Sequence, residues 1–193
     1  MNTLRNALGW AVALAAALAP GIAQQAAGPI VLGTTAAFSG PFAEYGEEYR
    51  KGADACLAPI NAAGGVRGRP VRIEYMDDGY EPARAVKNAR ELADKRAVAF
   101  VNLVGTGVLQ ALMPQLDELN LPVFGMSSGA DQLRANQPDS RWLFHTKASY
   151  GDEFKGFASV LPTIGMSKLA LVYQDNPFGK AGLQSAKAAF GPG

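Results

Sequence analysis

The sequence predicts an α/β fold built on a doubly wound parallel sheet, and three observations lead to that prediction. Short apolar runs typical of buried strands alternate along the chain with longer amphipathic stretches typical of helices. Glycine-rich turns separate them. The chain has 193 residues and is 48% hydrophobic, which suits one or two small domains. Strands that alternate with helices favour parallel pairing through right-handed crossovers.

The expected elements follow one another in a regular order. Each apolar run is read as a strand, and each stretch with apolar residues at helical spacing is read as a helix. One helix contains Pro114, which either kinks it or marks its first turn, and the pattern leaves both open. Strands are expected at 29–36, 70–77, 99–104, 121–124 and 168–173, and helices at 46–62, 82–94, 109–119, 152–161 and 179–190.

The stretch 97–130 is the centre of the prediction because it contains two strands that each end in a glycine loop. The two loops leave the same ends of parallel strands, where open α/β sheets bind ligands. Thr106 lies in the first loop, and Ser127 and Ser128 lie in the second. Hydroxyl and backbone N–H groups there suit an anion. Glycine, serine and threonine are equally ordinary turn residues, so both interpretations stay open.

A third loop, after the first strand, places Tyr45 beside the start of the first long helix. On a parallel sheet it lies at the same edge as Thr106 and Ser127. The ring of Tyr45 either covers a bound ligand or packs on its own helix, and the sequence does not decide between these.

The first 23 residues have the pattern of a signal peptide. A positive charge at Arg5 precedes the apolar stretch 7–19, and small residues precede a cleavage point after Ala23. The apolar stretch is shorter than the roughly 20 residues that span a bilayer. We therefore expect export to the periplasm and a mature chain that begins at Gln24.

Composition excludes several classes of partner and cofactor. Lys and Arg number 18 against 17 Asp and Glu, so no basic surplus favours nucleic acid. The single histidine, His145, has no partner at metal-ligand spacing, and no nucleotide-binding glycine motif occurs. No metal and no cofactor is expected. Cys56 lies on the apolar face of the first long helix and is expected to be a buried structural thiol.

The sequence also permits one catalytic interpretation, which is less favoured. Residues 125–129 match G-x-S-x-G, the nucleophile elbow of α/β hydrolases, with Ser127 as nucleophile. Asp131, Asp139 and His145 follow in a suitable order. These partners crowd into one connection rather than coming from separate strand ends. The chain is therefore not expected to be an enzyme.

Three motifs occurring in order resemble a known family. They are Ser-Gly-Pro at 39–41, I-N-A-x-G-G-V-x-G at 60–68 and D-D-x-x-x-P-x-x-A-V at 77–86. Together they are similar to the type I periplasmic solute-binding proteins of ABC importers, the leucine/isoleucine/valine-binding class. The resemblance continues through 141–153 and 170–183 and so covers nearly the whole mature chain.

The resemblance implies two doubly wound lobes that close on a ligand. Residues 24–146 would form the N-terminal ligand-binding lobe, and 147–193 the start of the second. The implied partners are a small carboxylate or amino acid and an importer permease in the membrane. A ligand-sensing module of a signalling receptor has the same fold and is the alternative.

The resemblance also implies site residues. Thr106 matches the hydroxyl residue that holds a ligand carboxylate, and Ser127 with Gly129 matches the pair that completes this anion site. Gly129 departs from the usual hydroxyl residue. Aromatic positions of the family match Tyr45 and Phe178, and Tyr150 is expected to face the cleft.

Two further departures limit what the resemblance says. Related proteins have a disulfide between the loops after the second and third strands, where this chain has Gly79, Tyr80 and Gly105. The acidic residue that holds a ligand amine in those relatives falls beyond Gly193, so an amine on the ligand is undetermined. Family members also continue well past this point. We therefore expect an incomplete chain with one wall of the cleft, weak affinity and exposed apolar residues in 168–173.

Overall fold

The computed structural model describes residues 28–134, 141–166 and 168–191. Its centre is a five-stranded sheet in the order β2-β1-β3-β4-β5, in which all neighbouring strands are parallel. The predicted signal peptide lies outside the described residues. The strands are β1 (Ile30–Ala36), β2 (Val71–Asp77), β3 (Phe100–Val101), β4 (Val123–Phe124) and β5 (Leu143–Phe144).

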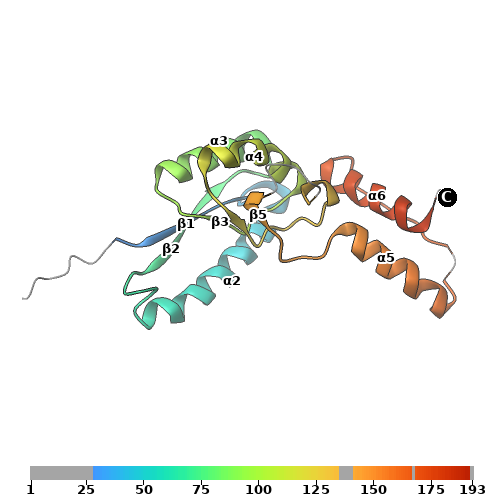
Figure 1. Ribbon diagram of the computed structural model, residues 1–193, viewed down its shortest axis with the longest axis horizontal. Helices are drawn as coiled ribbons and strands as arrows, with labels where there is room; N and C mark the ends of the chain where they lie inside the picture. The colour runs from blue at the N-terminus through green and yellow to red at the C-terminus, as the bar shows by residue number, and fades with distance from the viewer. Residues whose placement is uncertain (1–27, 135–140, 167, 192–193) are drawn as a thin grey trace, which may run out of the picture.

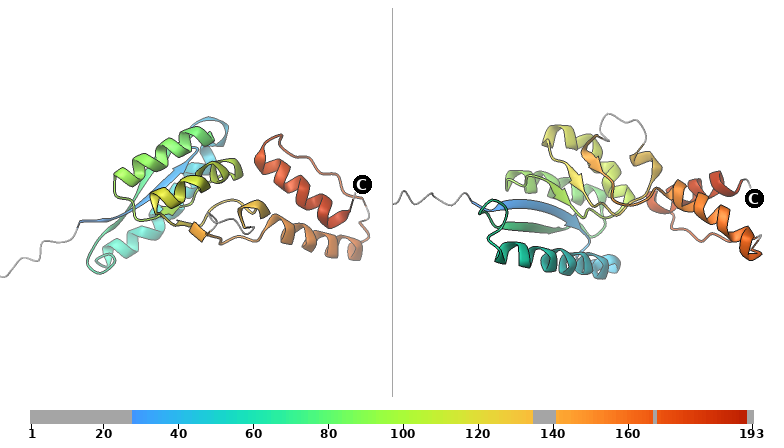
Figure 2. Two further views of the ribbon diagram at one scale, coloured as in Figure 1. Left: turned by 45° about the horizontal axis from the view of Figure 1, so that its top comes forward. Right: turned by 60° about the horizontal axis from the view of Figure 1, so that its bottom comes forward.

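Helices cover both faces of this sheet (Figure 1). Helices α3 (Pro82–Asp94) and α4 (Thr106–Leu119) lie on one face, and α2 (Ala43–Ala62) lies on the other, as the turned views also show (Figure 2). The predicted doubly wound α/β fold is therefore confirmed. Short 3-10 turns, η2 (Gly40–Phe42), η3 (Asp131–Leu133) and η5 (Leu161–Ile164), complete the chain together with α5 (Tyr150–Val160) and α6 (Pro177–Phe190).

The hydrophobic core lies between the sheet and the helices α3 and α4. Leu92 of α3, Phe100 of β3 and Leu109 of α4 are fully buried there. A side chain on Gly33 would lie only 3.2 Å from Leu92, so glycine lets α3 approach β1 closely. Pro114 lies well inside α4, and the alternative that it marks the first turn is wrong.

The face covered by α2 is packed less tightly, and the prediction for Cys56 is wrong. Cys56 is exposed. The apolar face of α2 does point toward β1 and β2, as Tyr49 and Leu57 show, but an open groove of about 560 Å³ remains between helix and sheet. A thiol on the rim of an open groove stays in contact with solvent.

Beyond the sheet, α5 and α6 pack against each other (Figure 1). Both helices were expected, but the strand predicted at 168–173 is not formed. Leu169 and Val172 are exposed in this segment, as anticipated for an apolar run without a covering layer. A strand needs a neighbour that accepts and donates its ladder of hydrogen bonds, and the described residues provide none beside it.

Asp131 connects this helical pair to the sheet. Its carboxylate accepts hydrogen bonds from the Gly151 N–H at the start of α5 (3.0 Å) and from the Ser185 hydroxyl of α6 (2.8 Å). Partial burial would raise the pKa of Asp131, but hydrogen bonds from Ser185, Ser149 and Gly151 outweigh burial and lower it. The lowered pKa means that the ionised carboxylate is the form that holds the helices.

We expect Asp131→Ala to loosen α5 and α6 because their donors lose an anionic acceptor. The opening free energy of the pair should fall by about 0.5 to 1.5 kcal/mol, because Asp131 is exposed and solvent screens its charge, and hydrogen exchange in 150–160 measures the change. Asp94→Ala, at an exposed carboxyl on α3, is the control. Because the folded pKa is lowered, this stabilisation is present above the unfolded pKa of about 3.9 and lost as pH falls through the folded pKa. Unchanged protection in Asp131→Ala would contradict the assignment.

Candidate functional site

The loops that follow β3 and β4 lie side by side at the carboxyl edge of the sheet. The Ser127 N–H donates to the Leu103 carbonyl at 2.8 Å, and Val104 and Ser127 form an isolated parallel bridge. Helix α4 begins at Thr106, directly after Gly105, whose φ of 105° favours glycine. The first N–H groups of an α-helix have no partner within it and favour an anion. The loops thus meet where the sequence predicts.

The hydroxyl groups of this edge form two separate pairs. Tyr45 Oη and Ser127 Oγ lie 2.9 Å apart, whereas Thr106 Oγ1 and Ser128 Oγ lie 2.8 Å apart and are buried. Thr106 is fully buried, so its hydroxyl is directed to Ser128 rather than toward Ser127. The structure brings Tyr45 and Ser127 together at the surface, and it uses Thr106 to connect the two loops beneath them.

Ser127 opens into a pocket of about 170 Å³ between the sheet edge and the start of α6. Tyr45 and Phe178, both expected from the resemblance, line this pocket. A larger hollow lies under α2, but its lining is mainly apolar. The lining residues of the candidate site are Phe42, Tyr45, Tyr80, Val104, Gly105, Ser127, Gln174 and Phe178.

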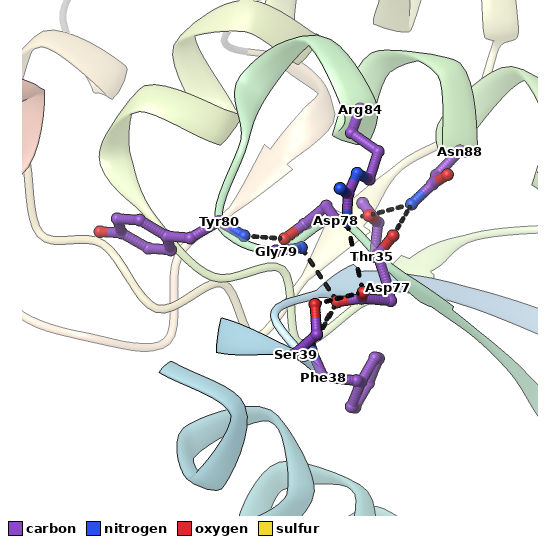
Figure 3. A network of polar contacts seen from close by, with 9 residues as sticks. All are labelled: Thr35, Phe38, Ser39, Asp77, Asp78, Gly79, Tyr80, Arg84 and Asn88. Atoms are coloured by element: carbon purple, nitrogen blue, oxygen red, sulfur yellow. Dashed lines mark hydrogen bonds and ion pairs between the residues drawn. The ribbon is translucent and has the colours of Figure 1, made fainter. Parts of the chain in front are cut away.

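Two carboxylates at the end of β2 hold the neighbouring loops in place (Figure 3). Asp77 accepts hydrogen bonds from the N–H groups of Phe38 (2.8 Å) and Gly79 (2.9 Å) and from the Ser39 hydroxyl (2.6 Å). Partial burial alone would raise the pKa of Asp77, but these hydrogen bonds and the Arg84 charge lower it. The loop after β1, which leads to Phe42 and Tyr45, is thereby fixed to the loop after β2.

Asp78 is fully buried and positions Tyr80. Its carboxylate accepts from the Thr35 hydroxyl (2.8 Å) and from the Tyr80 N–H (2.8 Å), and burial raises its pKa. Asn88 donates to the Thr35 hydroxyl at 3.0 Å and completes the network. The ring of Tyr80 points away from these groups (Figure 3).

That ring packs directly on Gly105. A side chain at Gly105 would lie 2.7 Å from the Tyr80 ring, so the contact requires glycine. The Tyr80 ring also lies 4.5 Å from the Phe42 ring, centroid to centroid. Tyr80 therefore connects the loops after β2 and β3 at the place where the resemblance implies a disulfide in related proteins. Tyr80 was not predicted to line the pocket, although its position at the site of the disulfide in related proteins could have indicated it.

Gly129 and Tyr150 lie behind the pocket rather than in it. Gly129 is buried, and a side chain there would lie 2.7 Å from both the Ala148 carbonyl oxygen and the Tyr150 ring. The Tyr150 N–H donates to the Gly129 carbonyl at 2.7 Å. Tyr150 is 6% exposed and makes an edge contact with Phe178, 5.9 Å between centroids. This packing explains why Gly129 replaces a hydroxyl residue, and it makes Tyr150 a support for Phe178.

The contacts of Ser127 and His145 bear on the hydrolase alternative. Ser127 pairs with Tyr45, a phenol. Burial and the nearby Arg134 charge lower the pKa of His145, which also interacts with the backbone of Leu133. Among the described residues, no hydrogen bond joins Ser127 to His145. In the part of the chain that the structure describes, the hydroxyl of Ser127 thus has a phenol as its partner.

The next two observations concern metal ligation and membrane-spanning helices. In 28–134, 141–166 and 168–191, no cluster of three or more metal-ligating side chains is present. In the same part of the chain, no helix has the length and hydrophobicity needed to cross a bilayer.

Comparisons with known proteins agree with this geometry. The family model described as "Periplasmic binding protein" matches residues 29–191. The Leu/Ile/Val-binding protein homolog 3 of Brucella melitensis is 30% identical over 183 residues, which are 94% of this chain and 49% of the relative.

Solved structures give the same result. A possible leucine/isoleucine/valine-binding protein from Rhodopirellula baltica superposes with a TM-score of 0.78 at 28% identity, over 86% of this chain and 44% of that one. A substrate-binding periplasmic protein from Ralstonia solanacearum superposes with a TM-score of 0.77 at 29% identity, over 83% of this chain and 45% of that one. The chain thus spans about half the length of the relatives that it matches. It belongs to the type I periplasmic binding protein family.

Proposed function

We propose that this chain is an extracytoplasmic solute-binding component of an ABC importer and binds a small carboxylate, such as a branched-chain or other amino acid. The observation that carries the proposal is the Tyr45–Ser127 hydroxyl pair, which opens into the aromatic pocket at the carboxyl edge of the sheet. The printed name of the Brucella relative, a Leu/Ile/Val-binding protein homolog, supports the same ligand class.

An anionic group suits this position for two physical reasons. Both hydroxyl groups can turn their protons toward an acceptor, and hydrogen bonds to a charged acceptor are stronger than those between neutral groups. Gly105, the residue before α4, also lines the pocket, so the positive end of the α4 dipole faces the same space. The carboxylate would lie at this polar end, with the rest of the ligand among the aromatic rings.

Transport requires two further features that we propose together with the ligand. One is export through cleavage of residues 1–23, and the other is a membrane permease that accepts the loaded protein. Membership of a periplasmic binding protein family supports both. We also propose the division at 146/147, with Phe178 as a contribution of the second lobe to the site.

Ser127→Ala and Tyr45→Phe are each expected to weaken binding of a small carboxylate about 10- to 100-fold, because each removes one hydrogen bond to the anion. Calorimetry with a panel of small carboxylates, extended by ligand-observed NMR for weak binders, measures this effect and identifies the ligand. Ser159→Ala, on exposed α5, is the control. Normal binding by Ser127→Ala, with loss of an ester hydrolysis activity, would support the enzyme instead.

Thr106→Val is expected to act mainly on stability. It leaves the buried Ser128 hydroxyl without its partner, which should lower the free energy of unfolding by about 1 to 3 kcal/mol. Denaturant unfolding measures the change, with Thr163→Val in exposed η5 as control. An unchanged stability combined with lost binding would show that the Thr106 hydroxyl contacts the ligand directly.

Export predicts a defined N-terminus. Cleavage after Ala23 should give a mature protein that begins at Gln24, because small residues precede this point. N-terminal sequencing of the periplasmic fraction tests it. Soluble protein that retains Met1 would contradict export and favour a sensor in the cytoplasm.

A further inference from the structure

We propose that the ligand of this pocket is a small aromatic carboxylate, an inference that rests on the proposed solute-binding function. Half of the pocket lining is aromatic, because four of its eight residues are Phe42, Tyr45, Tyr80 and Phe178. These rings come from η2 and the first turn of α2, from the loop after β2, and from α6.

Three of the four rings are incompletely covered by the protein itself. Phe42 is 36% exposed, Phe178 is 42% exposed and Tyr45 is 48% exposed. Large aromatic side chains gain from burial, and an exposed group of them around one hollow indicates a binding surface. A flat ring that enters the pocket would cover all three at once.

Each ring is also held by a neighbour on its outer side. Phe42 packs on Tyr80, and Tyr80 packs on Gly105. Phe178 has an edge contact with Tyr150, and Tyr45 pairs with the Tyr49 ring at 5.2 Å. Rings held in this way lose little conformational entropy when a ligand binds. Preorganised aromatic walls favour a ligand that can make offset or edge-to-face contacts with them.

The polar side chains of the pocket lining are uncharged. Tyr45, Tyr80 and Ser127 provide hydroxyl groups, and Gln174 provides an amide. These groups can bind one carboxylate through hydrogen bonds to its oxygens. The arrangement therefore fits a single ring with one carboxylate.

A matched pair of ligands tests the inference. Benzoate and cyclohexanecarboxylate share the carboxylate and a six-membered ring, and they differ in whether the ring is aromatic. We expect benzoate to bind the purified chain about three- to tenfold more tightly, the range that aromatic ring contacts supply. NMR titration to millimolar concentration measures both affinities, and leucine, valine and phenylalanine are titrated alongside.

A variant locates the effect in the pocket. Phe42→Leu keeps an apolar side chain and should remove most of the preference for benzoate while changing cyclohexanecarboxylate binding little. Phe157→Leu, at an exposed ring on α5, is the matched control and should keep the preference. Circular dichroism and thermal unfolding of each variant show whether it is folded.

The possible outcomes separate this inference from the proposed function. Equal affinities for benzoate and cyclohexanecarboxylate, or a preference that Phe42→Leu leaves intact, would overturn the aromatic ligand. Leucine or valine binding more tightly than benzoate would overturn it too, while the solute-binding function would stand. Failure of every carboxylate to bind would overturn both.

Discussion

The candidate site depends on two consecutive carboxylates at the end of β2. Neighbouring residues of a strand point to opposite faces, so Asp77 reaches the loop after β1 while Asp78 turns into the protein. The buried Asp78 carboxylate is stabilised because it accepts hydrogen bonds from the Thr35 hydroxyl and the Tyr80 N–H. Without these acceptors, the backbone donors of both loops would lose their partners. The rings of Phe42 and Tyr80 would then have no fixed position.

Sequence patterns predicted most of the fold because its strongest signals are local. Helix α3 has an amphipathic pattern with Pro82 in its first turn, and the structure places it within the predicted bounds. The missing strand at 168–173 shows the limit of such signals. An apolar run specifies a strand only where a neighbouring strand completes its hydrogen bonds. The exposed Cys56 has a similar cause, because helical periodicity identifies a face but not how tightly that face is covered.

The arrangement of the candidate site was predicted in part. Short glycine loops after parallel strands predicted Ser127 at the edge where the structure has it, and Tyr45 and Phe178, singled out by the resemblance, line the same pocket. The pairing of Thr106 with Ser128 depends on side-chain rotamers, which a sequence does not specify. Tyr80 was not predicted as a pocket residue. Its ring contacts Gly105, which is distant in sequence, and its backbone has a φ of 67°. A tyrosine in the left-handed backbone conformation is uncommon and has no simple sequence signature.

The Tyr45–Ser127 hydrogen bond also adds a free-energy cost to the binding of any molecule that enters the pocket. The two hydroxyl groups satisfy each other, so an arriving ligand must displace one partner from the other. An uncharged molecule with a single weak acceptor would exchange one neutral hydrogen bond for another and gain almost nothing. An anion receives two charge-assisted hydrogen bonds for the one that is broken. The pair therefore discriminates against neutral competitors of the same shape, such as amides and esters, with no positively charged side chain among the described lining residues.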